Sequence, residues 1–217
     1  MQRHTIRYGK TALTAPLPDS WRVSVLEPKG MNGLVDPDSA VRESLFSKPI
    51  CTEPLLSVLE KGRDLVILVS DKTRVSKADV LLPPILETAN RAGITDDNIT
   101  ILFACGTHGP HTPEERERIV GPRVAERIRL VDHDPQSTDA VFLGTTTAGT
   151  PVWVNKLACN ADRLVVTGTV QIHYFAGFGG GRKSILPGIC SEETIVKNHS
   201  LTMNPVSYTH LRAHETS

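Results

Sequence analysis

Residues 65–74 of this 217-residue chain read Leu-Val-Ile-Leu-Val-Ser-Asp-Lys-Thr-Arg. The first six contain no alternation of apolar and polar side chains, which is typical of a strand buried on both faces. Further apolar runs of this kind occupy 99–104, 128–131 and 163–170, and helical stretches lie between several of them. This order predicts a doubly wound, mostly parallel, Rossmann-like α/β sheet with helices on both faces.

The other expected elements surround these strands. Helices are predicted at 77–92, at 113–120 and from about Ser191, which is a suitable N-cap residue. Residues 140–154 hold a Thr-rich turn between two apolar pieces, and they predict an inserted β-hairpin. We expect all of these elements to form one α/β core over 63–205.

The first 62 residues are Pro-rich and irregular, and they form a lead-in to that core. Within the lead-in we predict strands at 5–9 and 21–26, and helices at 37–45 and 54–61. We expect lead-in and core together to make one domain over 1–205. Neither an internal repeat nor a low-complexity tract interrupts it.

The composition excludes several classes of protein. Twenty-four basic and twenty-four acidic residues give zero formal net charge, which favours neither a nucleic acid nor a membrane surface as a partner. The longest apolar runs are strand-sized and the N-terminus lacks the apolar core of a signal peptide, so we expect a soluble, cytoplasmic protein. The four cysteines form no Cys-x-x-Cys pair, which indicates buried thiols rather than a zinc site or a disulfide framework.

Reactive side chains follow three of the predicted strands. They stand in the segments Asp71-Lys-Thr-Arg74, Cys105-Gly-Thr-His108 and Gln171-Ile-His173. Ligands of doubly wound sheets bind beyond the carboxyl ends of the strands, so we expect these segments to border one crevice. An arginine suits a carboxylate, and a histidine can exchange a proton near neutral pH.

A glycine-rich segment follows the last of these strands. Residues 177–184 read Gly-Phe-Gly-Gly-Gly-Arg-Lys-Ser, and glycines gather where the backbone needs a positive φ or must approach a ligand closely. An anion is the natural ligand, and the Gly-x-x-Lys-Ser ending keeps part of a P-loop pattern. A nucleotide-phosphate-binding domain with kinase or hydrolase chemistry is therefore one alternative, and a flexible turn with surface Arg182 and Lys183 is another.

Three motifs in the same order resemble the lactate racemase family, whose members carry a nickel-pincer nucleotide. They are the Asp-x-Thr-Arg motif ending at Arg74, the Gly-Thr-His motif ending at His108, and the block from His173 to Gly188 with 193–199 after it. The resemblance covers the chain to about Pro205, and it implies that 1–205 is the family's N-terminal catalytic and cofactor-binding domain. It implies the α/β fold described above and the activity of a 2-hydroxyacid racemase or epimerase.

The resemblance implies the roles of the substrate and acid/base residues. His108 and His173 are the two acid/base histidines, while Asp71 and Arg74 bind the substrate, a small lactate-like 2-hydroxy acid. The reaction implied is reversible hydride transfer to the cofactor through a 2-keto acid. Many members have Arg after the first histidine, where Gly109 stands here, which leaves the identity of the hydroxy acid open.

The resemblance also implies the cofactor contacts. Lys183 would attach the pyridinium-type mononucleotide and His199 would bind its nickel. Further cofactor-binding candidates are Thr73, Gly179, Gly180, Gly181 and Ser184. The expected partners are the substrate and the enzymes that make the cofactor. His111 matches no position of the family motif, and we expect it to be a surface residue.

The last residues depart from the family. Residues 206–217 resemble one reading frame of an adapter used in sequencing libraries, and we expect them to be a non-native tail in which His210 and His214 bind no metal. The family's second domain would then be absent, and this fragment alone is expected to be inactive. An inactive fragment of the racemase is accordingly a third alternative for the chain.

Deleting residues 206–217 should leave the thermal unfolding midpoint unchanged within error, because a non-native tail contributes no packing. Differential scanning calorimetry of the chain with and without these residues measures the effect. A clear fall in the midpoint would show that the tail is part of the folded protein.

Overall fold

A computed structural model describes residues 1–26, 29–173 and 176–203. The chain divides into two units, Met1–Val35 and the part from Asp36 onward. In the first unit, β1 (Gln2–Tyr8) and β2 (Thr11–Leu17) pair as an antiparallel hairpin. The turn between them contains Gly9 at a φ of +59°, a conformation that glycine adopts without strain.

This hairpin changes one sequence prediction. Residues 21–26 form no strand, although their polarity alternates, so the strand predicted there is wrong. The partner of β1 is instead β2, which the sequence analysis missed. A tight turn brings two adjacent segments together at little entropic cost, whereas an alternating segment without a partner gains no backbone hydrogen bonds.

The second unit contains the predicted parallel sheet. Its strands are β3 (Leu65–Ser70), β4 (Ile99–Ala104), β5 (Arg129–Asp132) and β8 (Arg163–Val166). Over the described residues their order is β5-β4-β3-β8, and every neighbouring pair is parallel. β4 and β5 lie on one side of β3, whereas β8 lies on the other, so the strand order reverses between β3 and β8. Ligands of such sheets bind beside this reversal.

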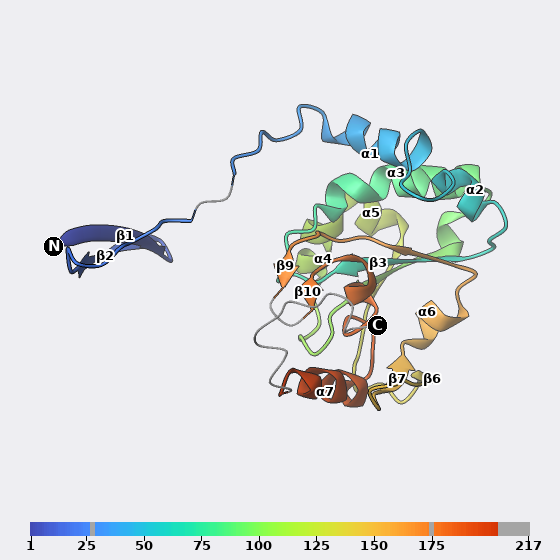
Figure 1. Ribbon diagram of the computed structural model, residues 1–217. Helices are drawn as coiled ribbons and strands as arrows, with labels where there is room; N and C mark the ends of the chain where they lie inside the picture. The colour runs from blue at the N-terminus through green and yellow to red at the C-terminus, as the bar shows by residue number, and fades with distance from the viewer. Residues whose placement is uncertain (27–28, 174–175, 204–217) are drawn as a thin grey trace. The chain divides into compact units, whose positions relative to one another are not determined.

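Helices cover both faces of the sheet, as predicted (Figure 1). On one face lie α1 (Pro37–Phe46), α2 (Leu55–Leu59), α3 (Ala78–Arg91), α4 (Pro113–Val120) and α5 (Pro122–Arg127). On the other lie α6 (Lys156–Asn160), α7 (Glu192–Ser200) and the predicted hairpin of β6 (Val141–Thr145) and β7 (Pro151–Val154).

Strand β3 supplies apolar side chains to both layers. Leu65, Ile67 and Val69 belong to the core cluster under α3, while Val66 and Leu68 belong to the cluster under α6 and α7. All five are at most 6% exposed. Successive side chains of a strand point to opposite faces, and both faces of β3 are covered. This burial on both faces explains the unbroken apolar run, as inferred from the sequence.

Several boundaries differ from those predicted. β8 ends at Val166 rather than at residue 170, and the short pair β9 (Ile172–His173) and β10 (Gly177–Phe178) follows it. The short helices α5 and α6 were not expected. Each contains only one or two turns, which is too short for a hydrophobic period to be visible in the sequence.

Other features of the described residues complete the comparison with the sequence. None of their helices is both long enough and apolar enough to cross a bilayer. We expected most of the four thiols to be buried; Cys105 and Cys190 are buried, Cys159 is half-buried, and Cys51 is exposed. The tail at 206–217 lies outside the described residues.

A substitution at Gly188 can test how tightly the loop after the glycine-rich segment packs against β4. A Cβ at this position would lie 2.7 Å from the carbonyl carbon of Ser184 and 2.8 Å from Cβ of Ala104. Gly188→Ala should therefore lower the free energy of unfolding by about 1–3 kcal/mol, the usual cost of overpacking. Urea denaturation followed by circular dichroism measures the change.

Gly109→Ala is the matched control for Gly188→Ala, because nothing lies within 4 Å of a Cβ built there. We expect its unfolding free energy to stay within about 0.5 kcal/mol of wild type. Equal stability of the two variants would contradict the packing of this loop.

Candidate functional site

A pocket of about 450 Å³ opens at the carboxyl ends of β3, β4 and β8. It lies beside the reversal of winding, where a ligand site is expected. The predicted site residues that line it are Asp71, Arg74, His108, His173, Gly179, Gly180, Lys183, Ser184 and His199. Thr73 and Gly181 do not contribute to the lining found among the described residues. The three predicted strand-end segments and the glycine-rich segment therefore meet in one place.

Asp71 and His108 form a pair at one side of this pocket. The Asp71 carboxylate contacts His108 Nδ1 and accepts hydrogen bonds from the Thr73 amide at 2.9 Å and from its hydroxyl at 2.6 Å. Burial raises the pKa of Asp71, but its bonds to Thr73 and His108 outweigh burial and hold the pKa below its ordinary value. An ionised Asp71 thus orients the imidazole, whose Nε2 becomes the nitrogen that can exchange a proton.

Thr73 serves the same pair from outside the pocket. Its two bonds to Asp71 close a local turn directly after β3, as aspartate side chains commonly do with the residue two positions on. The structure therefore gives Thr73 a position that supports Asp71. Its contact with a cofactor remains a prediction.

The opposite side of the pocket gathers basic groups. Lys183 is half-buried, and burial together with the charge of Arg74 lowers its pKa to about 8. Burial lowers the pKa of His173, and the charges of Lys183, Arg74 and His199 lower it further. Burial and the charge of Lys183 also lower the pKa of His199. Mutual repulsion of this kind is relieved by a bound anion.

Backbone geometry explains why glycine stands beside Lys183. Gly180 has a φ of +77°, and a Cβ on it would lie 2.9 Å from the Thr169 carbonyl oxygen. This close approach lets the glycine-rich segment pack against the residues that follow β8. A short 3₁₀ helix at Gly181–Ser184 comes next, and the Lys183 amide donates to the Gly180 carbonyl at 3.1 Å.

The same geometry weighs against the P-loop alternative. A P-loop runs from a strand through its glycines into a long helix whose first turn carries the Lys-Ser pair. Here Lys183 and Ser184 lie in a four-residue 3₁₀ helix, and α7 begins only at Glu192. Ser191 caps α7 as predicted, since its side chain accepts the Thr194 amide.

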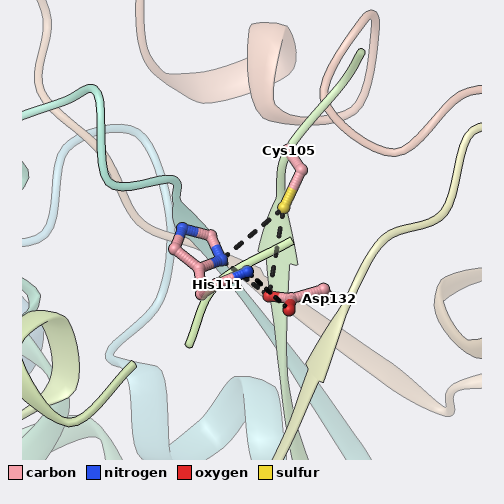
Figure 2. A group of neighbouring side chains, drawn as sticks. All are labelled: Cys105, His111 and Asp132. Carbon is pink, nitrogen blue, oxygen red and sulfur yellow. Dashed lines mark hydrogen bonds and ion pairs between the residues drawn. The ribbon is translucent and has the colours of Figure 1, made fainter. Parts of the chain in front are cut away.

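Sequence reasoning missed a group of side chains at the edge of the pocket, in which Cys105, itself a lining residue, lies close to His111 and Asp132 (Figure 2). The expectation that His111 is a surface residue is wrong, because its side chain is fully buried. The reason is that Asp132, at the end of β5, accepts hydrogen bonds from its ring and from its backbone amide. His111 follows β4 and Asp132 ends β5, so only the parallel pairing of these strands could have indicated the contact.

The chain matches known proteins over most of its length. A family model described as the lactate racemase N-terminal domain matches residues 8–210. The lactate racemase of Thermoanaerobacterium thermosaccharolyticum is 35% identical over 196 residues, which cover 89% of this chain and 46% of that protein. The lactate racemase of Lactiplantibacillus plantarum is 33% identical with the same coverage.

Solved structures give the same picture. The lactate racemase apoprotein from T. thermosaccharolyticum superimposes with a TM-score of 0.83 at 34% identity, covering 95% of this chain and 48% of that one. A Thermotoga maritima protein matches with a TM-score of 0.59 at 23% identity over 74% of this chain and 40% of its own, which shows a shared fold alone. The chain spans about half the length of the curated relatives it matches.

The lowered pKa of Lys183 gives a test of the basic cluster. The amine should become reactive with a midpoint near pH 8 instead of its ordinary 10.5, because burial and Arg74 both disfavour the charged form. Labelling with acetic anhydride across pH, followed by peptide mass spectrometry, measures the midpoint. Arg74→Gln should raise it, since a repelling charge is removed. An unchanged midpoint in that variant would show that Arg74 and Lys183 do not interact.

Proposed function

The chain belongs to the lactate racemase family, as the match to residues 8–210 and the relatives at 35% and 33% identity show, and from this we propose that it is the N-terminal part of a racemase or epimerase of a small 2-hydroxy acid. The resemblance inferred from the three sequence motifs is thereby confirmed. The observation that carries the proposed activity is that His108, from the loop after β4, and His173, from β9, line one pocket together with Arg74.

The residues of this pocket can exchange protons with either enantiomer of a hydroxy acid. Arg74 offers a planar fork of donors that suits the carboxylate of the substrate. His108 is oriented by Asp71, so its Nε2 can take the proton of the hydroxyl group. His173 Nδ1 accepts the amide of Ala176 at 3.2 Å, so the neutral ring carries its N–H on Nε2, and Nε2 could take a proton only after this bond is exchanged. We assign the two histidines to opposite enantiomers.

The residues present also fit the nickel-pincer nucleotide of the family. Lys183 supplies an amine whose pKa of about 8 leaves a substantial neutral fraction near neutral pH, as covalent attachment through this nitrogen requires. His199 supplies an imidazole, a usual protein ligand of nickel, and Ser184 with the glycine-rich segment supplies small polar contacts. When bound, the group would accept the C2 hydrogen with its electron pair and return it to either face of the resulting 2-keto acid.

The neighbours of Lys183 favour attachment over a purely electrostatic role. A lysine that only pairs with phosphate is best kept charged, whereas burial and Arg74 both favour the neutral amine here. The enzymes that make the cofactor are accordingly proposed as partners of the full-length protein. We propose in addition that the chain needs the other half of its relatives' length for activity.

Lys183→Arg tests this assignment. The full-length protein is expressed with nickel and the cofactor-making enzymes, and intact-mass spectrometry compares wild type with the variant. We expect a covalent adduct on wild type and bare polypeptide for Lys183→Arg, with racemisation lost, because an arginine keeps the charge but cannot form the same bond. Racemisation is followed by chiral chromatography of lactate.

The matched control is Lys197→Arg, an exposed lysine of α7, which should keep both adduct and activity. An active Lys183→Arg variant, or an active wild type without an adduct, would contradict covalent attachment. Absence of racemisation in a wild type that carries the adduct would contradict the proposed reaction instead.

A further inference from the structure

A chain of hydrogen bonds behind the pocket links the ends of three neighbouring strands. Asp132 at the end of β5 accepts from the ring of His111 at 2.7 Å, and His111 Nε2 receives the backbone amide of Lys72 at 2.9 Å. Lys72 is the residue next to Asp71, just after β3. Figure 2 shows the Asp132 end of this chain, where the ring of His111 faces the carboxylate.

The contacts of His111 determine where its ring carries a proton. A backbone N–H can only donate, so Nε2 must present a lone pair to Lys72. A neutral imidazole has one N–H, which therefore sits on Nδ1 and donates to Asp132. The side chain is fully buried, so water cannot substitute for either contact.

This assignment also explains why the group is not a metal site. Cys105 Sγ lies 3.9 Å from His111 Nδ1 and 4.0 Å from Asp132, so three potential ligands face one point. However, Nδ1 bears a proton, and Asp132 is already bound by Arg116 at 2.7 Å. Burial and the nearby carboxylates raise the pKa of the Cys105 thiol to about 12, which opposes the thiolate that a metal needs.

The segment that follows β3 has few other buried contacts. Among the described residues after Asp71, the side chains of Lys72, Thr73 and Arg74 are all exposed. Lys72 also pairs with Glu115 of α4 at 2.8 Å, but both of these side chains are partly exposed, and such pairs contribute little. Thr169 also donates its hydroxyl to the Val75 carbonyl at 2.7 Å, but this bond is exposed, so the buried ring of His111 is the attachment of Lys72 that water cannot replace.

We propose that His111 is a positioning residue: by accepting the Lys72 amide it fixes the backbone that carries Asp71, and Asp71 in turn orients His108 for proton exchange. The effect of His111 on catalysis rests on the proposed function. The positioning of Asp71 and His108 does not depend on that function. His111 touches no reacting group, since the described lining of the pocket does not include it. It acts through two residues that do line the pocket.

The hydrogen bonds can be measured on this chain without cofactor. Nitrogen-15 spectra of the histidine rings should show that His111 and His108 are protonated at Nδ1 and unprotonated at Nε2. A scalar coupling across the hydrogen bond should also connect the Lys72 amide nitrogen with His111 Nε2. A missing coupling, or a His111 ring protonated at Nε2, would overturn the proposal without any variant.

Two substitutions separate the contacts of His111. In His111→Gln the side-chain amide reaches the place of Nε2 and keeps an acceptor for Lys72, whereas in His111→Asn it reaches only the place of Nδ1 and keeps the contact with Asp132. We expect the Nδ1–H signature of His108 to persist in His111→Gln and to be lost in His111→Asn. Persistence in a folded His111→Asn, or loss in a folded His111→Gln, would overturn the positioning role.

Kinetics of the full-length enzyme test the consequence for catalysis. His111→Asn should lower kcat about 10- to 100-fold with little change in KM, because a base displaced by a fraction of an ångström is misaligned, while His111→Gln should stay near wild type. If the ring signatures change as expected but wild type does not racemise a hydroxy acid, the proposed function fails and the positioning of His108 stands.

Cobalt(II) distinguishes the rival interpretation. Added to this chain, it should produce no thiolate charge-transfer band, because Cys105 and His111 retain their protons. A band that disappears in Cys105→Ser would identify the group as a metal site and would overturn the proposal.

Discussion

Parallel pairing of β3 with a strand on each side is the constraint on which the pocket depends. Ser70 pairs with Ala104 of β4, and Leu68 pairs with Val166 of β8. Because these registers align the carboxyl ends, Asp71 and Cys105 leave the sheet at the same level, and the residues after Val166 face them. The three strand-end segments thus owe their places to backbone hydrogen bonds among buried apolar strands, while contacts such as that of Asp71 with His108 fix individual side chains.

Two opposite electrostatic environments share that edge. On one side Asp71 is buried but keeps its charge, because hydrogen bonds from Thr73 and His108 outweigh its desolvation. On the other side burial and mutual repulsion weaken the charges of Lys183, His173 and His199. The proposed substrate, bound between them, would meet a carboxylate–imidazole pair and a set of bases whose repulsion an anion relieves. The asymmetry arises from packing, since Asp71 directly follows β3, while the basic groups come from β9, the 3₁₀ helix at Gly181–Ser184 and α7.

Local patterns predicted the elements whose cause is local. β3, β4 and α4 begin and end where the sequence analysis placed them, because continuous apolar runs or a capping box with Thr112 and Glu115 mark their ends. The three motifs likewise indicated which side chains would meet. The β1–β2 hairpin and the burial of His111 could not be read in this way. Each depends on a partner segment, and for His111 this partner is Asp132, 21 residues further along the chain.

The early end of β8 has a consequence for how this protein can change. Beyond Val166, the Thr167 amide still donates to the Leu68 carbonyl, and a Cβ built on Gly168 would lie 3.5 Å from both Ser70 Oγ and Gly180 Cα. The pocket therefore lies in a notch at the edge of the sheet, where β8 stops short of its neighbour β3. Inserting one residue here would displace backbone that packs closely against Ser70 and Gly180, whereas insertions in the β6–β7 turn would leave this packing in place. Insertions and deletions in descendants of this sequence should accordingly be tolerated in the β6–β7 turn and selected against after Val166.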